Sequence, residues 1–269
     1  MMLLNPDQNK RWRSDGSIYE INADTTKVRV RVLSEAGKID INKADQVLLQ
    51  ALLANVPEDE KMKLKLVDAI LDWRDDDDLV HSNGAEKKEY KDAGLSYPPR
   101  NKPFQSLEEL QLVLGMNEII FLQLEPLITV YSGQSTVTLE QAAIEVLQIM
   151  PGLDTSLIDS YMTARLDSAI NNLPIPQPPS ITAQPATARQ VVTPEQTNVL
   201  TLVSEAWLDN ESSATITVTI KPAAHNNQSL HSPFQVLKWQ QLTTHNKSLF
   251  VEPMSELLVK QYAEPEFNN

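Results

Sequence analysis

The residues best suited to chemistry in this chain are the carboxylates of one short acidic segment. Residues 75–78 are four consecutive aspartates, and Glu86 follows shortly after Gly84. Neighbouring carboxylates repel one another, and a hard cation such as Ca²⁺ relieves that repulsion by taking several oxygen ligands. The segment does not follow EF-hand spacing, because Leu79 stands where a third ligand would be needed. The residues alone therefore leave two interpretations open: a calcium site and a solvated acidic loop.

Enzyme signatures are absent from the sequence. It contains no nucleophile elbow, no glycine-rich phosphate or dinucleotide loop and no HExxH motif. The four histidines, residues 81, 225, 231 and 245, are scattered through segments that we expect to be loops. Cysteine is absent, which excludes thiolate nucleophiles, disulfides and cysteine-ligated zinc. We expect no catalytic residues and no enzymatic activity.

The charge balance disfavours nucleic acid as a partner. The formal net charge is −13, with 36 acidic and 23 basic residues, whereas phosphate binding depends on clustered Lys and Arg. Glycine-centred turns at Gly115 and Gly152 resemble helix-hairpin-helix units, but Asn117 and Asp154 stand where that motif has a second glycine. A helix-hairpin-helix nucleic-acid binder and a calcium-dependent binding protein remain as alternative functions.

No stretch approaches the roughly twenty apolar residues of a membrane span. Residues 1–13 also lack the charged-then-apolar pattern of a signal peptide. We expect that any export or anchoring segment of the natural protein lies outside this sequence.

The elements that would position the acidic segment follow the order β, α, β. Residues 17–21 and 27–33 predict an edge hairpin, because Val28, Val30 and Val32 alternate with basic residues. Strands are also predicted at residues 199–207, 214–220 and 234–239. Between them, residues 171–196 contain many prolines, which predicts a linker or loop.

Residues 37–168 show helical periodicity. Leu64, Val67 and Leu71 predict one buried helix face. Ser106 with Glu109 has the spacing of a capping box, and Thr138 with Gln141 repeats it. These signals predict a helical domain between the two groups of strands.

Several separated motifs follow one another along the chain. They are GKIDIN at residues 37–42, LDW at 71–73 with Asp75 and Asp77, GAE at 84–86 with Tyr90, PFQSLEEL at 103–110, LEPLIT at 124–129 and PFQVLKW at 233–239. In this order, they resemble motifs of the K-type minor pseudopilins of bacterial type II secretion. The sequence LEQA at 139–142 departs from the family's usual LNTA. The similarity covers most of the chain.

The resemblance implies an α+β fold. A pilin-like antiparallel sheet domain, residues 1–35 and 197–269, would be interrupted by an inserted all-helical domain of the SAM-like or helix-hairpin-helix-like kind, residues 36–170. Residues 171–196 would be the proline-rich linker. The N-terminal pilin helix, through which such proteins contact the membrane, would be absent from this chain.

The resemblance also implies a function. Such a protein is a non-enzymatic subunit that caps the tip of the pseudopilus with the I-type and J-type minor pseudopilins, and its folded part lies in the periplasm, anchored to the inner membrane. Calcium is associated with the family, so the resemblance favours a Ca²⁺ site formed by Asp75, Asp77 and Glu86.

Overall fold

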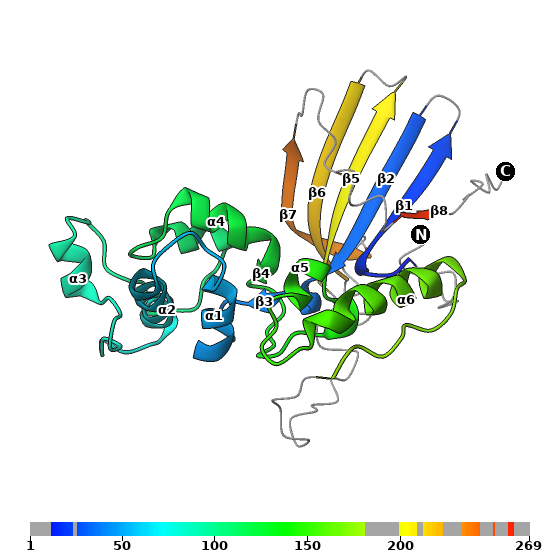
Figure 1. Ribbon diagram of the computed structural model, residues 1–269. Helices are drawn as coiled ribbons and strands as arrows, with labels where there is room; N and C mark the ends of the chain where they lie inside the picture. Colours follow the sequence, from blue (N-terminus) through cyan, green and yellow to red (C-terminus); the bar gives the residue numbers. More distant parts are fainter. Residues whose placement is uncertain are drawn as a thin grey trace.

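The computed structural model describes residues 12–23, 26–180, 199–208, 212–222, 233–242, 250 and 258–260. Within these residues, the expected mixture of helices and a largely antiparallel sheet is confirmed. Six strands from the two ends of the described chain form one sheet, in the order β7-β6-β5-β2-β1-β8 (Figure 1). They are β1 (Asp15–Ala23), β2 (Thr26–Ser34), β5 (Leu200–Leu208), β6 (Ser212–Pro222), β7 (Phe234–Leu242) and β8 (Leu258–Lys260).

The helices lie between β2 and β5 in the sequence. They are α1 (Gln46–Leu53), α2 (Glu60–Arg74), α3 (Lys87–Asp92), α4 (Glu118–Leu124), α5 (Ile144–Leu147) and α6 (Ile158–Ile170). Short 3₁₀ turns separate them: η3 (Glu35–Gly37), η4 (Leu107–Leu112), η5 (Glu125–Leu127), η6 (Leu139–Gln141) and η7 (Thr155–Leu157). A small parallel pair, β3 (Ile39–Asp40) with β4 (Ile128–Thr129), lies among them. The boundaries of the predicted domains stay a prediction, and residues 181–196 of the proline-rich segment are outside the described residues.

Two expectations about the sheet are wrong. The hairpin of β1 and β2 is not at an edge, because β2 pairs with β5 and β1 pairs with β8. The sheet is also not wholly antiparallel, since β8 runs parallel to β1. A hairpin does not reveal from its own sequence which further strands will pair with it.

One face of the sheet is apolar, as the alternation in β2 predicts. Cross-strand partners share a face, and the pairs Val32 with Leu202 and Leu202 with Val218 place apolar side chains side by side across three strands. We call this the apolar face of the sheet. At its β1 end it is covered by α6, where Tyr19 is buried against Ala169 and stacks on Trp12 with ring centroids 4.7 Å apart.

A second core fills the helical part. Its centre is α2, which buries Leu66, Val67, Ile70 and Trp73. The predicted face of α2 is partly wrong, because Leu64 is 40% exposed and the buried stripe begins at Leu66. Helix α2 begins where Asp59 accepts a hydrogen bond from the Met62 amide, the ordinary N-cap arrangement.

The two predicted capping boxes are also wrong. Ser106 and Thr138 precede 3₁₀ turns and make no side-chain capping bond. Glu109 instead pairs with Arg100, at 2.7 Å from Nη1 to Oε1. The spacing of a capping box identifies a helix start only where the chain continues into α-helix, which these segments do not.

The loop that follows the acidic segment is tied to the small sheet by a reciprocal amide contact. Asn42 accepts a hydrogen bond from the Phe104 amide (2.7 Å) and donates one to the Phe104 carbonyl (2.9 Å). Phe104 in turn stacks on Trp73 near the end of α2, with ring centroids 5.9 Å apart. The end of α2 and the residues just before Phe104 are thereby held close together.

Among the described residues, no helix has the length and apolar character needed to cross a membrane.

Candidate metal centre

The last turns of α2 present two buried carboxylates to the loop that follows. Asp68 and Asp72 lie four residues apart and so face the same side of the helix. Oδ2 of Asp68 accepts hydrogen bonds from the Asn83 amide (2.9 Å) and from the Asn83 side chain (3.0 Å). Oδ2 of Asp72 accepts one from the Ala85 amide, at 2.6 Å. These two side chains fold the acidic loop back against the helix.

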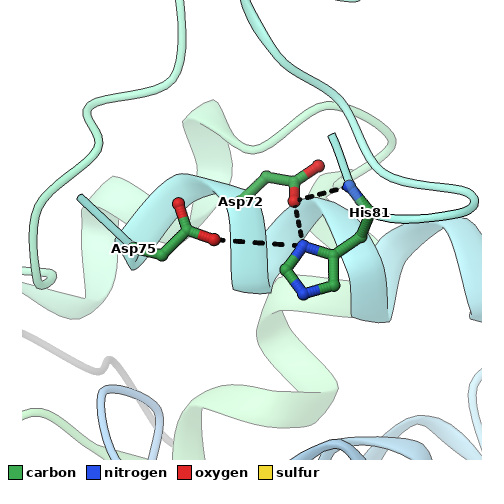
Figure 2. A group of neighbouring side chains, drawn as sticks. All are labelled: Asp72, Asp75 and His81. Atoms are coloured by element: carbon green, nitrogen blue, oxygen red, sulfur yellow. Dashed lines mark hydrogen bonds and ion pairs between the residues drawn. The ribbon is translucent and has the colours of Figure 1, made fainter. Parts of the chain in front are cut away.

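Asp72, Asp75 and His81 form a cluster in which one ligand atom from each lies within 4.8 Å of the others (Figure 2). Oδ1 of Asp72 accepts a hydrogen bond from the His81 amide, at 3.1 Å, and also contacts His81 Nδ1. The same Nδ1 lies 3.9 Å from Oδ2 of Asp75. The hydrogen bond to Asp72 raises the pKa of His81, with the charges of Asp72 and Asp75 acting in the same direction. Protonation of this imidazole would partly neutralise the negative charge of Asp72 and Asp75.

Next to this cluster, several oxygen atoms are buried without a hydrogen-bond donor. They are Oδ1 of Asp75, both carboxylate oxygens of Glu86 and Oδ1 of Asn101. A buried acceptor without a donor is costly, and a bound cation satisfies several such oxygens at once. Because all these atoms are oxygens from carboxylate and amide groups, the set fits a hard cation such as Ca²⁺ better than a metal that prefers nitrogen or sulfur.

Asn101 is held in position by the acidic loop itself. Its side-chain nitrogen donates to the Asp77 carbonyl, at 2.6 Å, and to Oδ1 of Asp78, at 3.0 Å. Its backbone has a positive φ of 51°, a conformation that asparagine adopts more readily than most residues. With its nitrogen committed to the loop, Asn101 leaves its side-chain oxygen available as an acceptor.

The electrostatics of the site also favour a bound cation. Burial raises the pKa of Glu86 to about 7, and the negative charges of Asp72, Asp75 and Asp78 add to the increase. The pKa of Asp75 is also raised, first by burial and then by the charges of Asp72 and Asp77. Carboxylates that resist ionisation because of one another become fully charged when a divalent ion joins them.

The three residues expected to bind calcium take different places. Asp75 belongs to the cluster, and Glu86 stands at the N-cap position of α3, where both of its carboxylate oxygens are buried. Asp77 is exposed, and its Oδ1 accepts a hydrogen bond from the Leu79 amide, at 2.8 Å. Asp77 affects the site through its negative charge, which contributes to the raised pKa of Asp75.

Sequence reasoning missed four participants in this site. Asp68 and Asp72 could have been found from their helical spacing, since two acids four residues apart within the apolar stretch 66–73 are unusual. His81 and Asn101 gave no such signal, because an isolated histidine or asparagine in a loop has no spacing that marks it.

Comparisons with known proteins agree with the resemblance seen in the sequence. Residues 26–133 match the family model described as type II secretion system protein K. The chain is similar to the type II secretion system protein K of Dickeya chrysanthemi, with 31% identity over 109 residues that cover 40% of this chain and 28% of that protein. The corresponding protein of Klebsiella pneumoniae is 32% identical over 84 residues, covering 31% of this chain and 26% of its own. The matched segment thus spans less than a third of either relative.

A solved structure shares the fold. It is the crystal structure of the GspK-GspI-GspJ complex from the type 2 secretion system of enterotoxigenic Escherichia coli, with a TM-score of 0.50 and 16% identity. The match covers 84% of this chain and 83% of that one, so it includes both the sheet and the helices. Over residues 26–133, the chain is therefore similar to the type II secretion system protein K family.

Proposed function

We propose that this chain is a non-enzymatic structural subunit that caps the tip of a type II secretion pseudopilus by assembling with I-type and J-type minor pseudopilins. It would act in the periplasm in support of protein secretion, as part of a protein anchored in the inner membrane. The observation that carries the proposal is the family match over residues 26–133, the segment that contains α1 to α4.

The shared fold supports the choice of partners. The solved structure that resembles this chain describes a related protein in complex with GspI and GspJ. That likeness concerns the fold alone, so the same assembly for this chain is part of the proposal. The helical part projects from one side of the sheet (Figure 1), a shape that suits a subunit with no further subunit above it.

Calcium belongs to the same proposal. The ion would be held by Asp75, Asp77 and Glu86, with Oδ1 of Asn101 as a further oxygen ligand. Asp72 would orient the loop through its hydrogen bonds with the amides of His81 and Ala85. The buried oxygens without donors support this assignment. A bound ion would order residues 75–86, because it connects the end of α2 to the start of α3.

No observation favours the nucleic-acid alternative. At the first glycine turn, Asn117 accepts a hydrogen bond from the Ile120 amide and caps α4. At the second, Asp154 accepts hydrogen bonds from the amide and hydroxyl of Ser156, at 3.0 and 2.6 Å, which lower its pKa. A carboxylate fixed at the hairpin repels a phosphate rather than binding it.

The proposal is tested by mixing the chain with the periplasmic parts of the I-type and J-type subunits of the same secretion system, with calcium and with a chelator. We expect one stoichiometric ternary complex in size-exclusion chromatography with light scattering when calcium is present. The same run with short duplex DNA in place of the two subunits should show no complex at physiological salt. Absence of a ternary complex, or a complex with DNA alone, would contradict the proposed function.

A further inference from the structure

The outer strand of the sheet carries the most exposed tryptophan among the described residues. Trp239 lies in β7 and is 59% exposed, and Val236 of the same strand is 47% exposed. Within the described part of the chain, β7 pairs only with β6, so no described strand lies against its outer edge. An outer edge of this kind presents backbone N–H and C=O groups to which another extended segment can bind.

A bulge places the exposed apolar side chains of β7 on one face. Ile220 pairs with Val236 and Thr219 pairs with Lys238, so β7 has one extra residue, Leu237, at this point. Val236 and Trp239 are three residues apart, and in a regular strand they would point to opposite faces. The bulge brings both onto the apolar face, next to Ile220 and Val218 respectively.

The apolar face is covered at one end and open at the other. At the β1 end, α6 and Trp12 leave Tyr19 only 2% exposed. In the centre, Val32 of β2 is fully buried. At the β7 end, Figure 1 shows the strand on the side of the sheet away from β1, and its apolar side chains are about half exposed. The surface left open is therefore the margin formed by Val236 and Trp239.

Lys238 is the one charged residue of β7, and it does not keep other strands away from the outer edge. Edge strands commonly carry a lysine that keeps other strands away. Lys238 lies on the opposite face with Thr219, and its ammonium group is 2.7 Å from Glu108 and 4.0 Å from Glu125 in the helical part. The lysine is thereby neutralised and directed toward the helices, and the remaining residues of β7 are uncharged.

From these observations we infer that β7 is a docking edge for an extended strand of another subunit, which pairs with the β7 backbone and packs apolar side chains against Val236 and Trp239. This inference rests on the proposed assembly function and names the surface that carries it.

The occupant is a strand from a different protein rather than from a second copy. Two copies of a chain with net charge −13 repel each other. The uncharged β7 edge offers no basic groups to offset that repulsion. The partner segment is therefore expected to be extended, with apolar residues at alternate positions and few acidic ones. Under the proposed function it belongs to the I-type or the J-type subunit.

The test compares three versions of this 269-residue chain for binding to the I-type and J-type periplasmic parts in the presence of calcium. They are the wild type, Val236→Lys with Trp239→Lys, and Val47→Lys as a matched control, because Val47 is also 59% exposed but lies on α1. We expect at least a tenfold loss of affinity for the β7 variant and no loss for the control. Amide hydrogen exchange of the wild type should show new protection of residues 234–242 in the complex, and circular dichroism verifies that both variants are folded.

Each other outcome overturns a defined part of the inference. If the wild type binds but the β7 variant binds equally well and residues 234–242 gain no protection, the docking edge is wrong while the proposed function stands. If the wild type binds neither subunit, the proposed function fails, and this inference fails with it. If residues 234–242 are already protected in the isolated monomer, another segment of the same chain covers the edge. If the wild type alone forms a dimer that the β7 variant does not form, the occupant is a second copy.

Discussion

Gly84 lies so close to Asp72 that a Cβ atom at position 84 would be 1.9 Å from Oδ2 of the aspartate. The same oxygen accepts the hydrogen bond from the Ala85 amide. The acidic loop can therefore reach the buried carboxylate on α2 only because residue 84 has no side chain. This contact gives a physical reason for the glycine in the GAE motif.

Replacing Gly84 by alanine should destabilise the protein, because Asp72 is fully buried and cannot move aside. We expect a loss of about 1–3 kcal/mol in the free energy of unfolding, the usual cost of overpacking a buried site. Denaturant unfolding measures this, and Ser82→Ala in the same loop is the control, expected to lie within about 0.5 kcal/mol of wild type. Equal stability of Gly84→Ala and wild type would show that the loop does not pack against Asp72 as described.

Calcium should raise the melting temperature of the wild type. An ion at 100 times its dissociation constant adds about 2.7 kcal/mol to folding stability, and each kcal/mol corresponds to about 2–4 °C for a protein of this size. Asp75→Asn should abolish the shift, because it removes the charge at the buried oxygen that lacks a donor. The matched control is Asp76→Asn, which makes the same charge change at an exposed neighbour. An equal calcium shift in both variants would exclude Asp75 as a ligand.

The chelated protein should lose stability as the pH rises from about 5 to 8. The pKa of Glu86 in the folded state is about 7, above its ordinary value of 4.5. The folded state therefore binds more protons than the unfolded state between these values, and stability falls as the pH rises through that window. His81 acts in the same direction, because its raised pKa stabilises the folded state below 6.5 and the contribution is lost above its folded pKa.

Melting temperatures in chelator across this pH range measure the effect. Glu86→Gln should flatten the profile, since glutamine does not titrate, and calcium should flatten it in the wild type by replacing the protons. A wild-type profile in chelator that rises with pH, or that is unchanged by Glu86→Gln, would contradict the assigned electrostatics.

Asn42→Ala should destabilise the protein by about 1–3 kcal/mol, because it leaves the amide and carbonyl of Phe104 without partners. Asn42→Asp keeps the acceptor for the Phe104 amide and loses the donor, so its effect should be smaller. Denaturant unfolding distinguishes the two, with the exposed Asn55→Ala as a control. If both Asn42 variants are as stable as wild type, the reciprocal contact does not hold the loop.

The sheet was more predictable from the sequence than the helical part. Alternation in β2 marked Val30 and Val32 as buried, and both are. The strand at β7 was also predicted. Its alternation of apolar and polar residues is interrupted between Val236 and Trp239, and the bulge opposite Thr219 and Ile220 explains the interruption. Pairing partners depend on contacts distant in sequence, which is why the position of the β1–β2 hairpin inside the sheet was not foreseen, although strands from both ends of the chain were expected to form one sheet.

The candidate site was predictable only in its charged members. The acidic segment drew notice as a run of carboxylates that a cation could neutralise, but Asp75 and Glu86 were assigned to a calcium site only through the family resemblance. Asn101 comes from a segment 15 residues beyond Glu86, and the fold alone brings it to the acidic loop. The role of Asp72 depends on the close approach of Gly84. This approach is a result of packing, and the spacing of residues in the sequence does not predict it.

The central claim, a subunit that caps the pseudopilus tip, is tested most directly by locating the chain on assembled filaments. Pseudopili would be assembled with a gold-labelled chain that carries the tag at exposed Leu79 in the acidic loop, and the labels would be counted by electron microscopy. The account predicts one label at one end of each filament. Labels distributed along the filament length would contradict it.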